Sequence, residues 1–431
     1  MLSFARATKN VKTHSPSDFT DEARLILLLC RGAISLREWD QVRDLLSMRL
    51  GWDWILDQVI LEEIYPLFYK NLEKLGFPEV PEHVRVRLHD IWKINGLRNT
   101  LLKEELVRVL GRLDEAGIAA IALKGVALSQ LLYGDPTLRV CSDIDILVPW
   151  EKAFRAFEAL QSVGYTCALT SSFFWRLLLR HDIEYPLLRE QEGFQYLVEI
   201  HWGVLWGGRS ETKVMREIWR EARPARVLGI SAYDLSPEWQ LLVLAAHAAR
   251  HQWQGLKWLV DLHDHCSSTK IDWQKAKDIA TRLGWQRILD VSFRICHVFF
   301  ATSRPPNLSR DTLPTWLKLF PDTDPLSRRN AFFPTRLMLR PSEKLRYLVR
   351  VFFVPTLAEH ELIRLPQRLS FLYYCVRSVR LVCKWTCVFL NRYLSKLNLI
   401  GRFGSRIQNS PPRTELQLIF DDEHRTKLRS T

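Results

Sequence analysis

The run SDIDILVP at residues 142–149 alternates between polar and apolar side chains and ends in a proline. In an extended strand, side chains at i and i+2 share a face, so Asp143 and Asp145 project together while the interleaved apolar residues face a core. Two adjacent carboxylates repel each other unless a cation lies between them, and rigidly held oxygen ligands suit Mg²⁺. The run therefore predicts a strand that carries two metal ligands. The alternative is the solvated end of an edge strand.

A short apolar run, IAAIALKG at residues 118–125, precedes this strand and ends in Lys124 and Gly125. A helical pattern follows it directly. Glycine lets the backbone approach a phosphate closely, and the first turn of a helix offers free N–H groups to it. Lys124 either supplies a charge to that phosphate or is a surface lysine at the end of a strand. Arg139 either binds a phosphate or forms a structural pair with a carboxylate.

The sequence LKGVALSQLLYGDPTLRVCSDIDILV at residues 123–148, followed by YLVEIHWG at 196–203, resembles the bacterial family of uncharacterised nucleotidyltransferases within the DNA polymerase beta-like superfamily. The resemblance implies a small palm domain in which Glu199 is the third carboxylate beside Asp143 and Asp145. There Glu199 would either bind the catalytic metal with them or take the proton of the acceptor. It implies two Mg²⁺ ions and a nucleoside triphosphate (NTP), whose nucleotidyl group moves to an acceptor hydroxyl or phosphate. The residues expected at the nucleotide are Lys124, Gly125, Arg139 and Ser142.

The sequence also departs from the superfamily. Val126 follows the glycine, where those enzymes usually have a serine that touches phosphate. A second hypothesis is therefore a non-catalytic relative that binds a nucleotide or a partner. Glu199 itself is either the third carboxylate or an exposed acid on a strand. A buried glutamate in the apolar run YLVEIHW needs a partner, which favours the functional role.

Helical periodicity surrounds the strands, which predicts an α+β fold with a small mixed sheet embedded in a largely helical protein. Two further strand candidates are DIEYPLL and YLVEIHW, and Ser236 with Pro237 marks the start of a helix. We expect, in order, a flexible leader (1–20), an N-terminal helical region (21–117), the nucleotidyltransferase palm (118–230), a helical region packed on it (231–302), a loop (303–328), and a basic helical C-terminal region with a tail (329–431).

Several histidines suggest a zinc site. His247 and His251 are one helical turn apart, and LHDHC places three more possible ligands nearby. HAARH lacks the glutamate of the HExxH motif, so we expect structural or substrate-facing histidines instead. His201 shares a strand face with Glu199 and is expected at the edge of the active site.

The charge balance points to anionic partners, because 61 Lys and Arg residues exceed 48 Asp and Glu residues and give a net charge of +13. The basic C-terminal region interleaves arginines with apolar residues. It is predicted either to pack on the core, to lie on an anionic membrane surface, or to contact nucleic acid. Arginines and lysines in its apolar stretch argue against a membrane-spanning helix. Scattered cysteines and the polar N-terminal stretch predict a cytoplasmic protein, peripheral at most to the inner membrane surface.

Overall fold

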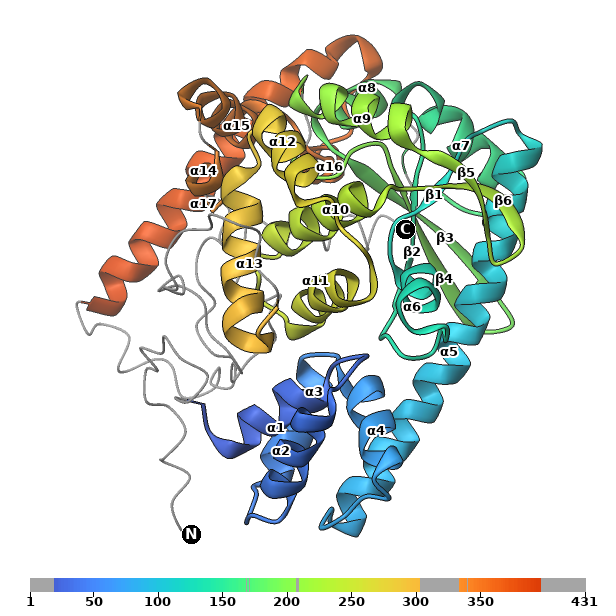
Figure 1. Ribbon diagram of the computed structural model, residues 1–431. Helices are drawn as coiled ribbons and strands as arrows, with labels where there is room; N and C mark the ends of the chain where they lie inside the picture. The colour runs from blue at the N-terminus through green and yellow to red at the C-terminus, as the bar shows by residue number, and fades with distance from the viewer. Residues whose placement is uncertain are drawn as a thin grey trace.

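The computed structural model describes residues 19–167, 169, 171–206, 209–302, 333–338 and 340–396. Nearly all of the expected leader, the expected loop at 303–328 and the tail beyond 396 lie outside the described residues. Figure 1 shows the sheet at one side of the molecule and helices around it. The expectation of an α+β fold with a small mixed sheet is confirmed.

The described part of the chain begins with five helices: α1 (Asp21–Leu29), α2 (Leu36–Leu46), α3 (Trp52–Leu61), α4 (Tyr65–Lys74) and α5 (Glu82–Glu115). Side chains cap the first two of these helices. Ser35 and Glu38 form a capping box at α2, which satisfies backbone N–H groups that the first helical turn leaves without a partner.

The central sheet has the strand order β1-β2-β4-β3. Its strands are β1 (Ile121–Ala122), β2 (Ile144–Leu147), β3 (Glu184–Gln191) and β4 (Phe194–His201). β1 and β2 are antiparallel, β2 and β4 are parallel, and β3 and β4 form an antiparallel hairpin. The parallel pair requires a long crossover, which contains η2 (Trp150–Lys152), α7 (Ala153–Gln161), α8 (Ser172–His181) and β3.

A second, two-stranded sheet lies beside the first. It comprises β5 (Arg223–Val227) and β6 (Ile230–Asp234), and it follows α9 (Arg209–Glu221). The turn residues Leu228 and Gly229 both have positive φ, 52° and 87°, as a tight two-residue hairpin turn requires. The backbone N–H of Tyr233 donates to Ala120 O at 2.9 Å, which joins β6 to the segment before β1. The hairpin spans the boundary expected at residue 230.

Helices complete the fold: α6 (Gly125–Tyr133), α10 (Pro237–Arg250), α11 (Leu256–Ser268), α12 (Trp273–Leu283), α13 (Gln286–Phe300), α14 (Pro334–Leu337), α15 (Pro341–Phe353), α16 (Leu357–Leu362), η4 (Gln367–Leu372) and α17 (Tyr373–Lys396). The helix start expected at Ser236 is confirmed, since its side chain accepts a hydrogen bond from Trp239 N. No helix within the described ranges combines the length and the apolar character needed to cross a membrane.

Two hydrophobic cores meet along α5. Val84 and Leu88, near its start, belong to a core with the other N-terminal helices and α10–α13. Leu102, Leu106 and Val109, further along, belong to a second core with the sheet, α7 and α8. The loop that precedes β2 is bound to the middle of α5, because Asn99 Nδ2 donates hydrogen bonds to Pro136 O and Arg139 O, each at 2.7 Å. The helix thus connects the N-terminal helices to the strand that carries the aspartates.

Candidate active site

The register of the two parallel strands β2 and β4 brings the acidic residues of the site together. In the pairing of β2 with β4, Asp145 lies opposite Glu199. Asp143 precedes β2 by one residue, and Asp145 lies within the strand. The parallel pairing therefore brings together side chains that are 54 positions apart in the sequence.

Asp145 is the most enclosed of the three acids, with 4% of its surface exposed. Its Oδ1 lies 2.9 Å from Lys124 Nζ and 2.9 Å from His201 Nε2. Burial alone would raise the pKa of this carboxyl. The charge of Lys124 and the hydrogen bond and charge of His201 outweigh burial and hold the pKa of Asp145 well below its usual range.

Asp143 behaves in the opposite way. Burial raises the pKa of this carboxyl to about 7, with further contributions from the negative charges of Asp145 and Glu199. Lys124 and Lys257 act against that rise. The charges of Asp145 and Glu199 thus disfavour ionisation of Asp143, and a divalent cation bound here would offset that repulsion.

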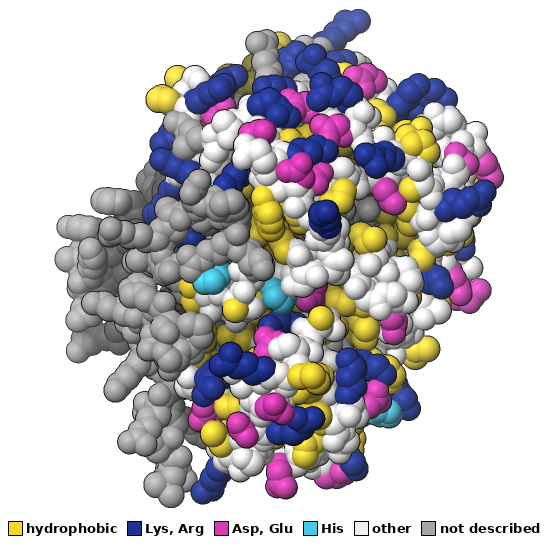
Figure 2. Space-filling model, viewed as in Figure 1, with side chains coloured by type: hydrophobic (Ala, Val, Ile, Leu, Met, Phe, Trp, Pro, Cys, Tyr) yellow, Lys and Arg dark blue, Asp and Glu magenta, His cyan; other side chains and the backbone are white. Residues whose placement is uncertain are grey.

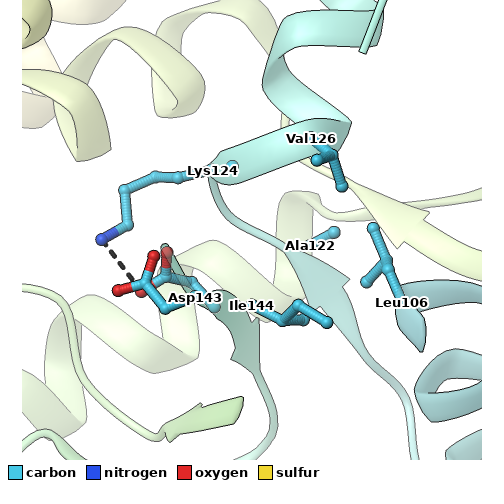
Figure 3. A pocket seen from close by; sticks show the side chains of 8 residues that line it. Leu106, Ala122, Lys124, Val126, Asp143 and Ile144 are labelled. Carbon is cyan, nitrogen blue, oxygen red and sulfur yellow. Dashed lines mark ion pairs between the residues drawn. The ribbon is translucent and has the colours of Figure 1, made fainter. Parts of the chain in front are cut away.

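Gly125 and Lys124 adjoin this group. Gly125 has φ +65°, and a Cβ placed on it would lie 3.4 Å from the backbone oxygen of Asp143. The glycine therefore begins α6 directly against the aspartate segment. Lys124 caps α6 from an extended conformation, and its side chain reaches back toward the carboxylates, as Figure 3 shows.

Lys124 is largely covered by its neighbours, which argues against the alternative of a surface lysine. Only 9% of its side chain is exposed, and its ammonium group lies between Asp145 and His247 Nδ1, 3.2 Å away. Burial and the neighbouring charge of Lys124 hold the pKa of His247 well below its usual range, so His247 is neutral. Apolar side chains close the other side of this small pocket: Leu106, Ala122, Val126 and Ile144.

Arg139 and Ser142, the other residues expected at the nucleotide, lie differently. Arg139 is 7% exposed, and its guanidinium binds both carboxylate oxygens of Asp261 on α11. This geometry favours the structural role for Arg139 over phosphate binding. Ser142 is exposed at the start of the aspartate segment.

Sequence reasoning missed the partners of His201. Its Nδ1 lies 3.1 Å from Glu184 Oε2 on β3, and Glu184 in turn accepts hydrogen bonds from Arg250 on α10, at 2.7 and 3.0 Å. Burial opposes the positive charge of His201, but Glu184, Asp145 and Glu199 raise its pKa to about 9. The register of the β3–β4 hairpin places Glu184 opposite His201. The contact of Arg250 with Glu184 depends on how α10 packs beside the sheet.

The other histidines make separate contacts. His263 Nδ1 lies 2.8 Å from Thr302 Oγ1, and His265 Nε2 lies 2.9 Å from Pro237 O. His251 stacks on Trp258 with ring centroids 3.8 Å apart. Across the part of the chain that the structure describes, the group of side chains suited to a metal ion is Asp145, Glu199 and His201.

Comparisons with known proteins place this geometry in context. A family model described as "Uncharacterised nucleotidyltransferase" matches residues 49–301. No curated protein matches the sequence. A solved structure titled as an antigenic nucleotidyltransferase-like protein from Paracoccidioides brasiliensis is similar over 46% of this chain and 96% of its own, with 18% identity and a TM-score of 0.29.

Proposed function

Because the chain belongs to the family of uncharacterised nucleotidyltransferases, we propose that it transfers a nucleotidyl group from an NTP to an acceptor hydroxyl or phosphate with divalent cations, Mg²⁺ among them. The observation that carries the proposal is the convergence of Asp143, Asp145 and Glu199 beside the Gly125 turn. Asp143 and Asp145 are proposed as metal ligands and Glu199 as the third carboxylate.

The donor set fits this chemistry. Carboxylate oxygens on a strand suit hard divalent cations, which would activate the acceptor oxygen and neutralise the triphosphate. In the reaction a bond forms between the acceptor oxygen and the α-phosphorus, the α–β phosphoanhydride bond breaks, and pyrophosphate leaves. The proton of the acceptor passes to a nearby base, and Glu199 is proposed for that role.

Lys124 and Gly125 are proposed to receive the phosphates. The ammonium of Lys124 lies at the carboxylates, and the first turn of α6 starts at Gly125. Free N–H groups at a helix N-terminus and a lysine charge are a common way to hold phosphate. Val126 packs into the core instead of offering a hydroxyl, so the lysine supplies the polar contact at this turn.

A labelling experiment tests the proposal. The purified protein is incubated with Mg²⁺ and NTPs labelled at either the α- or the γ-phosphate. Transfer of the α-label with release of pyrophosphate supports nucleotidyl transfer, whereas transfer of the γ-label indicates phosphoryl transfer. Asp145→Asn should abolish the signal, and Asp278→Asn, an exposed acid on α12, should retain it. Nucleotide binding without turnover by the unaltered protein would favour the non-catalytic relative.

The C-terminal region supports a second proposal, contact with an anionic membrane surface. Around η4, Leu362, Leu369 and Phe371 are 60%, 41% and 61% exposed, next to the exposed Arg364 and Arg368. Apolar side chains that project beside arginines are typical of segments that lie in a lipid interface. Binding to nucleic acid would call for a surface of Lys and Arg side chains alone. On the face that Figure 2 shows, Lys and Arg side chains are interspersed with Asp and Glu.

A further inference from the structure

A second lysine, Lys257, reaches the aspartate segment from α11. It is the second residue of that helix, and its Nζ lies 3.5 Å from Val140 O, three residues before Asp143. Its charge, like that of Lys124, acts on Asp143 and lowers the pKa of that carboxyl. Two ammonium groups from different elements therefore lie within electrostatic reach of one carboxylate.

Two contacts fix the turn that presents Lys257. Gly255 precedes α11 with φ +128°, and a Cβ there would lie 2.5 Å from the Trp258 ring, so glycine is required. The carboxylate of Glu62, between α3 and α4, accepts a hydrogen bond from Leu256 N. An acid at a helix N-terminus is favourable. The start of α11 is therefore held in place without help from the Lys257 side chain.

Glu63, the next residue after Glu62, pairs with the ammonium group of Lys257. Its backbone has φ 55°, in the left-handed region that residues other than glycine rarely adopt. The Glu63 side chain is 45% exposed, whereas that of Lys257 is 14% exposed. The acid is thus the partner that faces solvent, and a dissolved anion can replace it while the lysine stays where it is.

We propose that Lys257 is a second binding residue for the phosphate chain of the NTP, and that Glu63 occupies its ammonium group until the nucleotide displaces it. The inference rests on the proposed function and refines it, because it extends the phosphate-binding surface from the Gly125 turn to α11. A triphosphate gains more from two lysines than a monophosphate does, so this surface favours triphosphates.

Competition gives the two partners opposite effects on nucleotide affinity. Removal of the Lys257 ammonium takes a charge-assisted contact away from the phosphate, whereas removal of the Glu63 charge frees that ammonium for it. A purely structural ion pair would give effects of the same sign, since either loss would disturb the same turn. The sign of the Glu63 effect therefore separates the two roles.

Isothermal titration calorimetry of the full chain tests the proposal. The probes are the α,β-methylene analogues of the common NTPs with Mg²⁺, which cannot be cleaved at the α–β linkage. Lys257→Met should raise the Kd by about tenfold or more, the usual effect of losing a hydrogen bond to a charged group. Glu63→Gln should lower the Kd by about two- to fivefold, the usual contribution of a partly exposed ion pair. With nucleoside monophosphates, both effects should be smaller.

Lys275 and Glu221 provide a matched control pair. They form a partly exposed ion pair between α12 and α9, with an N–O distance of 2.9 Å. Lys275→Met and Glu221→Gln therefore change the net charge by the same amounts away from this surface, and both should leave the Kd unchanged. Thermal melts establish that each variant is folded. Because Glu63 is well exposed, Glu63→Gln tests the competition even if Lys257→Met does not fold.

An unchanged Kd in Lys257→Met would overturn the inference, as would binding that Glu63→Gln weakens or leaves unchanged. Label transfer by the unaltered protein would in that case leave nucleotidyl transfer standing as the proposed function. Conversely, opposite shifts of Kd in a protein that transfers no label would support the phosphate site and remove the catalytic proposal. Unaltered protein that binds none of the analogues would overturn both.

Discussion

Arg139, ahead of β2, and Asp261, on α11, form a buried bidentate ion pair with N–O distances of 3.0 and 2.9 Å. The pair fixes the loop that leads into the aspartate segment against the helices that follow the sheet. Burial opposes the charge of Arg139, but Asp261 raises its pKa further above the usual value. Removing one partner leaves the other charge buried without compensation.

Asp261→Asn should therefore lower the free energy of unfolding by about 3–5 kcal/mol. The measurement is urea denaturation followed by circular dichroism. Asp40→Asn is the control, because Asp40 pairs with Arg43 at the surface and the loss should stay below about 1 kcal/mol. Equal losses in the two variants would contradict the structural role of the buried pair.

Gly125→Ala should impair transfer beyond its cost in stability. Alanine at φ +65° costs about 1–2 kcal/mol, and this strain would fall on the turn whose Cβ would contact Asp143 O at 3.4 Å. Gly193→Ala provides the control, because Gly193 has φ +76° and a Cβ there would meet open space. Both variants should lose similar stability by thermal melting, but only Gly125→Ala should lose label transfer. Equal label transfer by the two variants would show that the turn beside the aspartate segment tolerates alanine.

Lys124→Met should raise the KM for the NTP by at least about tenfold, since one charge-assisted phosphate contact is worth roughly 1.5–3 kcal/mol. Steady-state kinetics with varied NTP concentration measure the change. Lys70→Met on α4 should leave KM unaltered, because Lys70 pairs locally with Glu73. An unchanged KM in Lys124→Met would show that Lys124 does not bind the phosphates and that its role is to neutralise Asp145.

Asp264 should make stability depend on pH. Burial raises the pKa of this carboxyl to about 7, although Tyr133 Oη and Gly32 N donate hydrogen bonds to its Oδ2. The folded state thus holds a proton that the unfolded state releases near pH 4, so the contribution is complete below about pH 4 and is lost as pH rises through about 7.

The comparison with Asp264→Asn isolates this effect. Asparagine stays neutral, and its amide oxygen can accept both hydrogen bonds. From about pH 5 to 7 the stability of the unaltered protein should fall relative to the variant by about 1.4 kcal/mol per pH unit. Denaturation at several pH values measures the difference, and a difference that does not vary with pH would refute it.

Replacement of Leu369 and Phe371 by serine should weaken binding to vesicles that contain anionic lipid by about tenfold or more, because each buried apolar side chain contributes about 1.5–3 kcal/mol. Vesicle sedimentation measures the change. Leu36→Ser is the control, since Leu36 is 86% exposed on α2, away from η4. Unaltered protein that does not sediment with anionic vesicles would exclude a membrane partner for this surface.

Local patterns in the sequence account for much of the fold. The alternation in SDIDILVP predicts β2, and YLVEIHW predicts β4, because period-two patterns directly reflect which face of a strand is buried. The β5–β6 hairpin escapes such reasoning, since its turn uses Leu228 at positive φ, an unusual residue for that conformation.

In the candidate site, too, some residues can be predicted from the sequence and others cannot. Asp143, Asp145 and Gly125 are close in sequence, so spacing alone suggests that they act together. The chain from His201 through Glu184 to Arg250 arises from a strand register and the docking of a helix, and Arg139 and Asp261 are 122 residues apart. Contacts of that kind are set by tertiary packing and leave no periodic signal in one sequence.

The distribution of these partners along the chain has a consequence for synthesis. Asp143 and Asp145 emerge from the ribosome long before Arg250 and Asp261, the side chains that secure their surroundings. A nascent chain that ends before α10 would carry the acidic strand without its supporting ion pairs. The proposed transferase activity would then arise only late in translation, and fragments released early would lack it.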